Sequence, residues 1–135
     1  KADFKAYCLL GDGEIQEGQV WEAAMTASHH KLDNLCAILD CNKVQENAPV
    51  VEIKNEEPLS DKWRSFGWHV IEAGGHDFNQ LISALDEFDT IKTKPTLILA
   101  HTIKGKGVSF MENQLIWHYY IVTEEHREKA LQELI

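Results

Sequence analysis

Two short apolar runs, each followed directly by polar residues, constrain the fold of this 135-residue chain more than any other feature. The first run is Ala6 to Leu10, which leads into Gly11-Asp12-Gly13, and the second is Leu35 to Cys41, which leads into Asn42-Lys43-Val44. A strand, a turn, a helix of about four turns and a return strand need roughly thirty residues. The spacing therefore places Asp12 and Asn42 at the carboxyl ends of neighbouring parallel strands, where open α/β sheets bind ligands.

The segments around these runs predict a layered fold. The stretch from Gln16 to Lys31 reads as a helix, because its small apolar residues recur on one face. Apolar segments at Trp68 to Ala73 and Pro95 to His101 predict two further strands, and the polar stretch from Gln45 to Leu59 predicts a loop. Because strands alternate with helices, we expect an α/β fold with a mostly parallel open sheet and helices on both faces.

The same pattern predicts which positions are buried. Neither Ala6 to Leu10 nor Leu35 to Cys41 alternates between apolar and polar residues, so both are expected to be strands covered on both faces. Ser60, Asp77 and Thr123 are expected to begin helices. The helical positions expected to face the core are Val20, Ala23, Ala24, Ala27, Trp63, Phe66, Leu81, Ile82, Leu85, Phe88, Ala130, Leu131 and Leu134.

Composition excludes several functional classes. The formal net charge of −9 argues against a nucleic-acid partner, because phosphate backbones bind basic surfaces. No apolar run approaches the roughly 18 residues that a membrane-spanning helix needs. We expect residues 1–135 to form a single cytoplasmic domain without a membrane partner. Cys8, Cys36 and Cys41 are expected to be buried free thiols, since no CxxC pair supports the alternative of a zinc or redox site.

Oxygen ligands occur at the ends of both apolar runs. Asp12 contributes a carboxylate, Asn42 an amide oxygen and Val44 a backbone carbonyl. A hard cation such as Mg²⁺ selects this kind of donor set, and Mg²⁺ usually keeps positions open for the phosphates of a cofactor or substrate. The three residues therefore predict a magnesium site at the edge of the sheet.

Backbone donors near Asp12 predict an anion site beside the metal. Gly11 and Gly13 let the chain turn sharply and approach an anion closely, and Gly13 and Glu14 would offer N–H groups to a diphosphate. An isolated Asp-Gly pair is also a commonplace turn, so the prediction depends on the strand context and on the spacing to Asn42. The run Lys104-Gly105-Lys106-Gly107 lacks the glycine spacing of a Walker loop, which argues against a nucleotide site.

Longer segments resemble one family. Gly11 to Trp21 reads GDGEIQEGQVW, residues 29–45 read HHKLDNLCAILDCNKVQ, and Ala100 to Asn113 reads AHTIKGKGVSFMEN. GDG followed by Asn at this distance resembles the thiamine diphosphate fingerprint, and together the segments resemble the cofactor-binding section of transketolases over nearly the whole chain. The resemblance implies a thiamine diphosphate-binding domain that uses Mg²⁺. Its cofactor-binding residues would be Gly11, Asp12, Gly13, Glu14, Asn42 and Val44.

The resemblance also implies an activity and a partner. Transketolases move a two-carbon ketol unit from a ketose phosphate to an aldose phosphate. His118 follows Trp117 and matches a family histidine that contacts substrate or cofactor, so it is the candidate catalytic residue; a surface histidine beside aromatic packing is the alternative. In the family, the glutamate that activates the cofactor lies in the pyrimidine-binding domain. We therefore expect a partner chain that carries this C-terminal section, in a homo- or hetero-oligomer.

Two departures from the family pattern leave other functions open. Glu46 stands where an aliphatic residue normally packs beside the cofactor, and Tyr119 to Val122 replace a Gly-Lys-Ala-Pro-like turn. Both favour the alternative of an interaction subunit or non-catalytic remnant. Among enzymes, a thiamine-dependent 2-oxo acid decarboxylase or dehydrogenase component is a further alternative. The chain also starts without Met and close to the first strand, so we expect the beginning of the domain to be missing.

Overall fold

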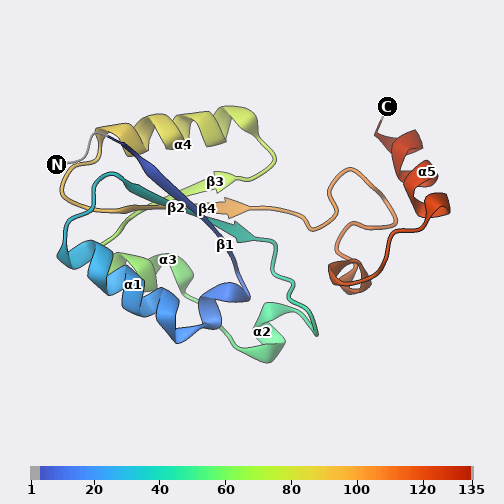
Figure 1. Cartoon of the computed structure of the whole chain (residues 1–135), viewed down its shortest axis with the longest axis horizontal. Helices are drawn as coiled ribbons and strands as arrows, with labels where there is room; N and C mark the ends of the chain where they lie inside the picture. Colours follow the sequence, from blue (N-terminus) through green and yellow to red (C-terminus); the bar gives the residue numbers. More distant parts are fainter. Residues whose placement is uncertain (1–3, 135) are drawn as a thin grey trace.

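A parallel sheet forms the centre of the computed structural model, which describes residues 4–134. Its strands are β1 (Ala6–Gly11), β2 (Leu35–Cys41), β3 (His69–Gly74) and β4 (Thr96–His101), in the order β1-β2-β4-β3 (Figure 1). All three pairings in this sheet are parallel, so the carboxyl ends of its strands meet at one edge. The predicted parallel α/β sheet is confirmed, and Gly11 of β1 lies beside Asp40 of β2.

Helices cover both faces of this sheet. The helical segments are η1 (Glu14–Gln16), α1 (Gly18–His29), α2 (Val50–Ile53), α3 (Leu59–Ser65), α4 (Phe78–Thr90), η2 (Leu115–His118) and α5 (Glu124–Glu133), of which η1 and η2 are 3-10 helices. α1 and α3 lie on one face and α4 on the other (Figure 1). Asp77 and Thr123 cap α4 and α5 through their side chains, as predicted. Within residues 4–134, no helix combines the length and the apolar character needed to cross a membrane.

Aromatic side chains join the helices to the sheet. On the α1 and α3 face, Trp63 is 1% exposed, and its ring packs against those of Trp21 and Trp68 at centroid distances of 5.2 and 4.9 Å. On the α4 face, Phe88 belongs to a buried group that includes Ile98 of β4. This close packing holds the strands, and with them the loops at the carboxyl edge of the sheet.

β1 differs from the prediction of a fully covered strand. It lies at the edge of the sheet, where Tyr7 is 55% exposed and Leu9 is 72% exposed. Leu10 points the other way, into the buried group that also contains residues of α1. β2 lies between β1 and β4 and is largely buried, as predicted. The described elements thus cover β1 only in part, and an apolar run alone does not reveal its place in the strand order.

Several boundaries and faces also differ from the predictions. The helix after β1 begins later than expected, at Gly18, since residues 14–16 form a 3-10 turn. The predicted loop contains α2. Ser60 does not cap α3, which begins at Leu59 after the N-cap residue Pro58; the Ser60 hydroxyl donates to Glu72 instead. Four predicted core positions are exposed, namely Ala23, Ile82, Leu131 and Leu134. The last two lie at the end of the chain, in and after α5, which stands apart from the sheet (Figure 1).

The three cysteines differ in accessibility, contrary to the prediction that all are buried. Cys8 on β1 is exposed, whereas burial raises the pKa of Cys36 to about 11 and that of Cys41 to about 12. Because the thiolate is the reactive form, a thiol reagent at mildly alkaline pH should label Cys8 quickly and the other two only on unfolding. Counting the fast-reacting thiols of the native chain and of Cys8→Ser checks this. A fast thiol in the variant would contradict the burial of Cys36 and Cys41.

Candidate functional site

The loops after β1 and β2 meet at the side chain of Asp12, which is 5% exposed. One carboxylate oxygen accepts a hydrogen bond from the N–H of Gly13 at 2.9 Å, and the other accepts one from the N–H of Lys43 at 2.5 Å. Lys43 has a left-handed backbone conformation, with φ of 66°, in the turn that follows β2. Asp12 thus joins two loops that are far apart in the sequence.

The side chain of Asn42 is held at both ends of its amide group. Its Oδ1 accepts a hydrogen bond from the N–H of Val44 at 2.9 Å, and its Nδ2 donates one to Asp40 at 3.1 Å. An amide oxygen has two lone pairs and a carboxylate has about four acceptor sites, so Asn42 and Asp12 keep acceptor capacity for a cation. The predicted ligand atoms therefore lie in adjoining loops and remain able to bind a metal ion.

One cavity of about 580 Å³ adjoins both loops. Every residue predicted to bind the cofactor or to act in catalysis lines it: Gly11, Asp12, Gly13, Glu14, Asn42, Val44 and His118. His118 is exposed and lies in η2, so the segment after β4 brings this residue back to the carboxyl edge of the sheet. The structure brings these residues together, and their roles in binding and catalysis stay predictions.

Neither Gly11, at the end of β1, nor Gly13 has a positive φ, so neither makes a turn that only glycine can adopt. Gly13 has an ordinary φ of −64°, and a Cβ there would lie 2.7 Å from Oε1 of Gln45. Gly11 has room for a Cβ, whose nearest neighbour would be the Cβ of Glu14 at 3.8 Å. The Gly11 N–H donates to the Glu14 carboxylate at 3.0 Å. Close packing therefore explains Gly13, and the N–H groups of both glycines already face carboxylate anions.

The charge environment of Asp12 suits a cation. Burial raises the pKa of Asp12, hydrogen bonds from Lys43 and Gly13 oppose this change, and the charge of Asp40 adds to it. A nearby cation would favour the ionised form of such a carboxylate. Among residues 4–134, no cluster of three His, Cys, Asp or Glu side chains is arranged to hold a metal ion. The predicted ligand set therefore fits Mg²⁺ when further oxygens, such as those of a diphosphate, complete the coordination.

Lys104 also lines this cavity, although the sequence patterns did not identify it as a site residue. Gly105 makes its position possible, because φ is 73° there and a Cβ would lie 2.6 Å from the carbonyl oxygen of Met111. The N–H of Asn113 closes the loop by donating to the carbonyl of Lys104 at 2.9 Å. Lys104 places a cation beside several carboxylates, and the family-like segment that contains it was the signal that could have identified it.

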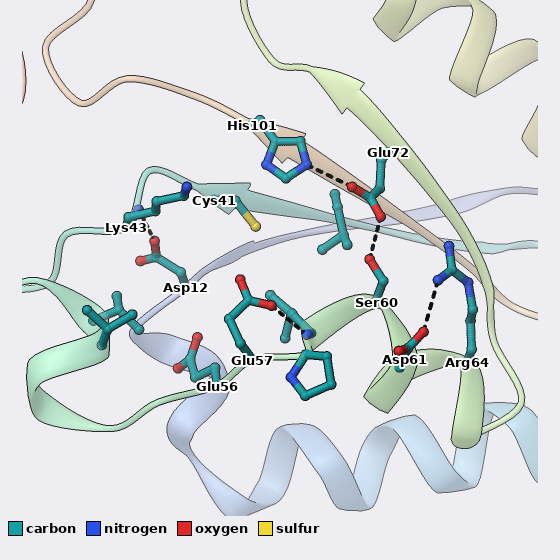
Figure 2. Close-up of a pocket in the computed structure, with 15 residues that line it drawn as sticks. Asp12, Cys41, Lys43, Glu56, Glu57, Ser60, Asp61, Arg64, Glu72 and His101 are labelled. Atoms are coloured by element: carbon teal, nitrogen blue, oxygen red, sulfur yellow. Dashed lines mark hydrogen bonds and ion pairs between the residues drawn. The ribbon is translucent and has the colours of Figure 1, made fainter.

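A second cavity, of about 450 Å³, also has Asp12 in its wall (Figure 2). Beside it, the Ser60 hydroxyl donates to Glu72 at 2.6 Å, and His101 lies 3.1 Å from the other oxygen of Glu72. The Ser60 hydrogen bond, followed by that of His101, lowers the pKa of Glu72. These contacts join α3 to the carboxyl ends of β3 and β4, and the sequence patterns did not reveal them because their residues are widely separated in the chain.

Glu56 is a buried carboxylate in the wall of the second cavity, and burial raises its pKa above the ordinary value of 4.5. The folded chain therefore holds the proton of the Glu56 carboxyl more tightly than the unfolded chain does. The contribution of Glu56 to stability falls as pH rises from about 4.5 through the raised pKa of the folded chain. Relative to the parent, Glu56→Gln should become more stable as pH rises above 4.5. Urea unfolding at several pH values checks this. The exposed control Glu128→Gln should show no such trend.

Comparisons with known proteins agree with this arrangement. The family model described as "Transketolase, thiamine diphosphate binding domain" matches residues 1–132. The chain is 43% identical to one of the subunits of the apulose-4-phosphate transketolase of Phocaeicola vulgatus over 134 residues, which is 99% of the chain and 48% of that protein. It is 40% identical to human transketolase over 134 residues, which is 99% of the chain and 21% of that protein.

The fold agrees as well. The crystal structure of transketolase from Campylobacter jejuni matches 98% of the chain and 21% of its own length, with a TM-score of 0.91 and 35% sequence identity. The chain thus spans about half the length of the Phocaeicola relative and about a fifth of the length of the transketolases. The family model covers nearly all of the sheet, helices and loops described above. The chain therefore belongs to the transketolase family and represents its thiamine diphosphate-binding domain.

Proposed function

We propose that this chain is the diphosphate-binding half of an enzyme that transfers a two-carbon ketol unit between sugar phosphates, using thiamine diphosphate and Mg²⁺. The observation that carries this proposal is the shared cavity at the carboxyl edge of the sheet, whose wall holds Asp12, Asn42, Val44, Lys104 and His118. Membership of a domain family described as binding thiamine diphosphate supports it. Residues 1–135 would form a single, partial domain of that enzyme.

Three oxygens of this chain would hold the magnesium ion. They are a carboxylate oxygen of Asp12, Oδ1 of Asn42 and the backbone carbonyl of Val44, and diphosphate oxygens would fill the remaining positions. Gly11 would leave room for the diphosphate to approach the backbone. When bound, thiamine diphosphate supplies the electron sink for breaking the C–C bond, while the residues of the chain bind and orient the reacting groups.

Lys104 and the backbone N–H of Glu14 would offset the charge of the diphosphate, whereas the Gly13 N–H, which was also predicted to do so, already donates to Asp12. Lys104→Ala is expected to weaken thiamine diphosphate binding about tenfold or more, because a hydrogen bond to a charged group contributes ~1.5–3 kcal/mol. Lys106→Ala is the matched control, since Lys106 lies in the same loop and pairs with Glu112 at 3.3 Å. Calorimetric titration in excess Mg²⁺ measures both affinities. Equal losses in the two variants would contradict a specific role for Lys104.

His118 would act on the substrate within the same cavity. Its neighbour Trp117 packs edge-on against Phe110 at a centroid distance of 5.4 Å, and the Trp117 indole N–H donates to the carbonyl of Phe110 at 2.9 Å. These contacts hold the 3-10 turn that carries His118. An imidazole has two ring nitrogens that can donate or accept hydrogen bonds, so His118 would bind a sugar hydroxyl or move a proton there.

A partner chain would complete the enzyme. The chain spans about half of its Phocaeicola relative, which is itself named as one subunit of a transketolase. We infer that a partner carries the pyrimidine-binding section of a transketolase and supplies the remaining cofactor contacts, in a homo- or hetero-oligomer that acts on sugar phosphates. Exposed apolar side chains, such as Leu9 at 72% and Ile121 at 82%, provide surface for such contacts.

Glu46 favours a second candidate function, that of a non-catalytic subunit. It lines the cavity and places a carboxylate near the proposed diphosphate site, where like charges repel. Ile53 lines the same cavity and offers an apolar contact in place of the aliphatic side chain expected at position 46. The family match argues against the alternative of a 2-oxo acid decarboxylase or dehydrogenase component.

One experiment separates these functions. The chain is mixed with its partner chain, and both Tm and two-carbon transfer from a ketose phosphate to an aldose phosphate are measured with Mg²⁺ and thiamine diphosphate. A rise in Tm together with turnover supports the enzyme. A rise in Tm without turnover supports the non-catalytic subunit. No change in Tm would contradict the assignment of Asp12 and Asn42 to a cofactor site.

A further inference from the structure

The carboxylate of Asp40 lies directly behind Asn42, at the carboxyl end of β2. Its Oδ2 accepts a hydrogen bond from Nδ2 of Asn42 at 3.1 Å, and its Oδ1 accepts one from the hydroxyl of Thr102. The backbone N–H of Thr102 donates to the carbonyl of Cys41 at 3.3 Å, which holds the loop after β4 against β2. One oxygen of Asp40 therefore holds the loop that follows β2, and the other joins the ends of the neighbouring strands β2 and β4.

The chemistry of Asp40 determines which end of the Asn42 amide faces it. An ionised carboxylate only accepts hydrogen bonds, whereas an amide group has a donating nitrogen and an accepting oxygen. Asp40 therefore pairs with the nitrogen of Asn42 and turns the oxygen away. On that other side the oxygen accepts the N–H of Val44 at 2.9 Å and adjoins the cavity. If the amide rotated by half a turn, its NH₂ group would face the cation and repel it.

We propose that Asp40 is a positioning residue, which fixes the amide of Asn42 so that its oxygen, and not its nitrogen, faces the bound cation. The inference rests on the proposed function, because it assigns a role toward the magnesium ion. Groups that hydrogen-bond to metal ligands orient them in this way, and their loss commonly lowers metal affinity by about 10- to 100-fold. The role needs no contact between Asp40 and the metal, because Asp40 acts through the side chain of Asn42.

Exchanging the two residue types tests the inference. In Asp40→Asn, the new amide no longer favours one orientation of Asn42, and only the Val44 N–H still does, so Mg²⁺ affinity in the presence of thiamine diphosphate should fall about tenfold or more. In Asn42→Asp, the two carboxylates face each other and repel, so the ligand oxygen is no longer held in place and affinity should be lower than in the double exchange. The double exchange restores an NH₂ donor facing an oxygen acceptor and leaves an oxygen toward the metal. Its affinity should exceed that of either single variant.

A control variant separates the contact of Asp40 with Asn42 from its contact with Thr102. Thr102→Val removes the other hydrogen bond of Asp40 and should weaken Mg²⁺ binding less than Asp40→Asn does. Calorimetry that finds the double exchange no better than the tighter-binding single variant overturns the inference and leaves Asp40 a structural role. A parent chain without magnesium-dependent cofactor binding overturns the proposed function, and this inference with it.

A second measurement tests the amide orientation without any metal. The side-chain NH₂ protons of Asn42, followed by NMR in the metal-free chain, should exchange with solvent more slowly in the parent than in Asp40→Ala. The reason is that the hydrogen bond to Asp40 protects one of these protons. Equal exchange rates in the two chains would overturn the positioning role even where the parent binds Mg²⁺ and cofactor normally.

Discussion

Replacing Asp12 by asparagine is expected to abolish the magnesium-dependent binding of thiamine diphosphate. Asp12 is the sole carboxylate of the proposed ligand set, and it is buried where the loops after β1 and β2 meet. A neutral amide attracts Mg²⁺ far less than a carboxylate. With cofactor at about 100 times the parent Kd, binding should stabilise the parent by ~2.7 kcal/mol and the variant hardly at all. Thermal unfolding with and without Mg²⁺ and cofactor measures this difference.

The matched control for this variant is Asp86→Asn. Asp86 is exposed on α4, on the opposite face of the sheet from α1, and its replacement makes the same change in charge. It should retain the full rise in Tm. Because Asp12 also accepts hydrogen bonds from Gly13 and Lys43, urea unfolding without cofactor is needed to show that its variant folds. A full rise in Tm for a folded Asp12→Asn would place the metal elsewhere.

Replacing Trp63 by alanine is expected to lower the free energy of unfolding by ~3–5 kcal/mol, the cost of a large cavity in a packed core. Trp63 is 1% exposed and packs against the rings of Trp21 and Trp68. Since whole domains are stable by about 5–15 kcal/mol, this loss should shift the urea midpoint strongly. Phe78→Ala, at a position that is 81% exposed, is the control and should change stability by ~0.5 kcal/mol or less.

A milder substitution identifies the cause of this loss. The indole N–H of Trp63 is buried without a hydrogen-bond partner in the part of the chain that the structure describes. Trp63→Phe retains an aromatic ring and removes this polar group, whose burial costs ~1–3 kcal/mol. It should therefore destabilise the chain much less than Trp63→Ala. Similar losses for the two variants would show that the volume of the ring is not what stabilises this core.

Local patterns predicted much of the fold. The apolar runs and the spacing between Asp12 and Asn42 predicted two adjacent parallel strands, and the capping chemistry of Asp77 and Thr123 predicted where two helices begin. These features could be predicted because they depend on residues close together in the sequence. The resemblance to transketolases added His118, which the structure places on the same cavity as the strand ends.

Other features depend on contacts between distant segments. The exposed face of β1 follows from its place at the edge of the sheet, and Gly13 is required because Gln45 packs against it. Lys104 reaches the cavity through the loop after β4, and Asp40 acquires its proposed role from partners in two different segments. None of these relations has a local pattern, because strand order and loop contacts decide them.

Residue types and short spacings were enough to predict the oxygen ligands, which stay a prediction, and to identify the strands and the family that the chain resembles. Contacts in three dimensions were needed to establish which of those ligands share a cavity, how the amide of Asn42 is turned and which cation stands beside them. The two kinds of information differ because hydrogen-bond direction and burial depend on distances across the sheet, which a linear spacing does not contain.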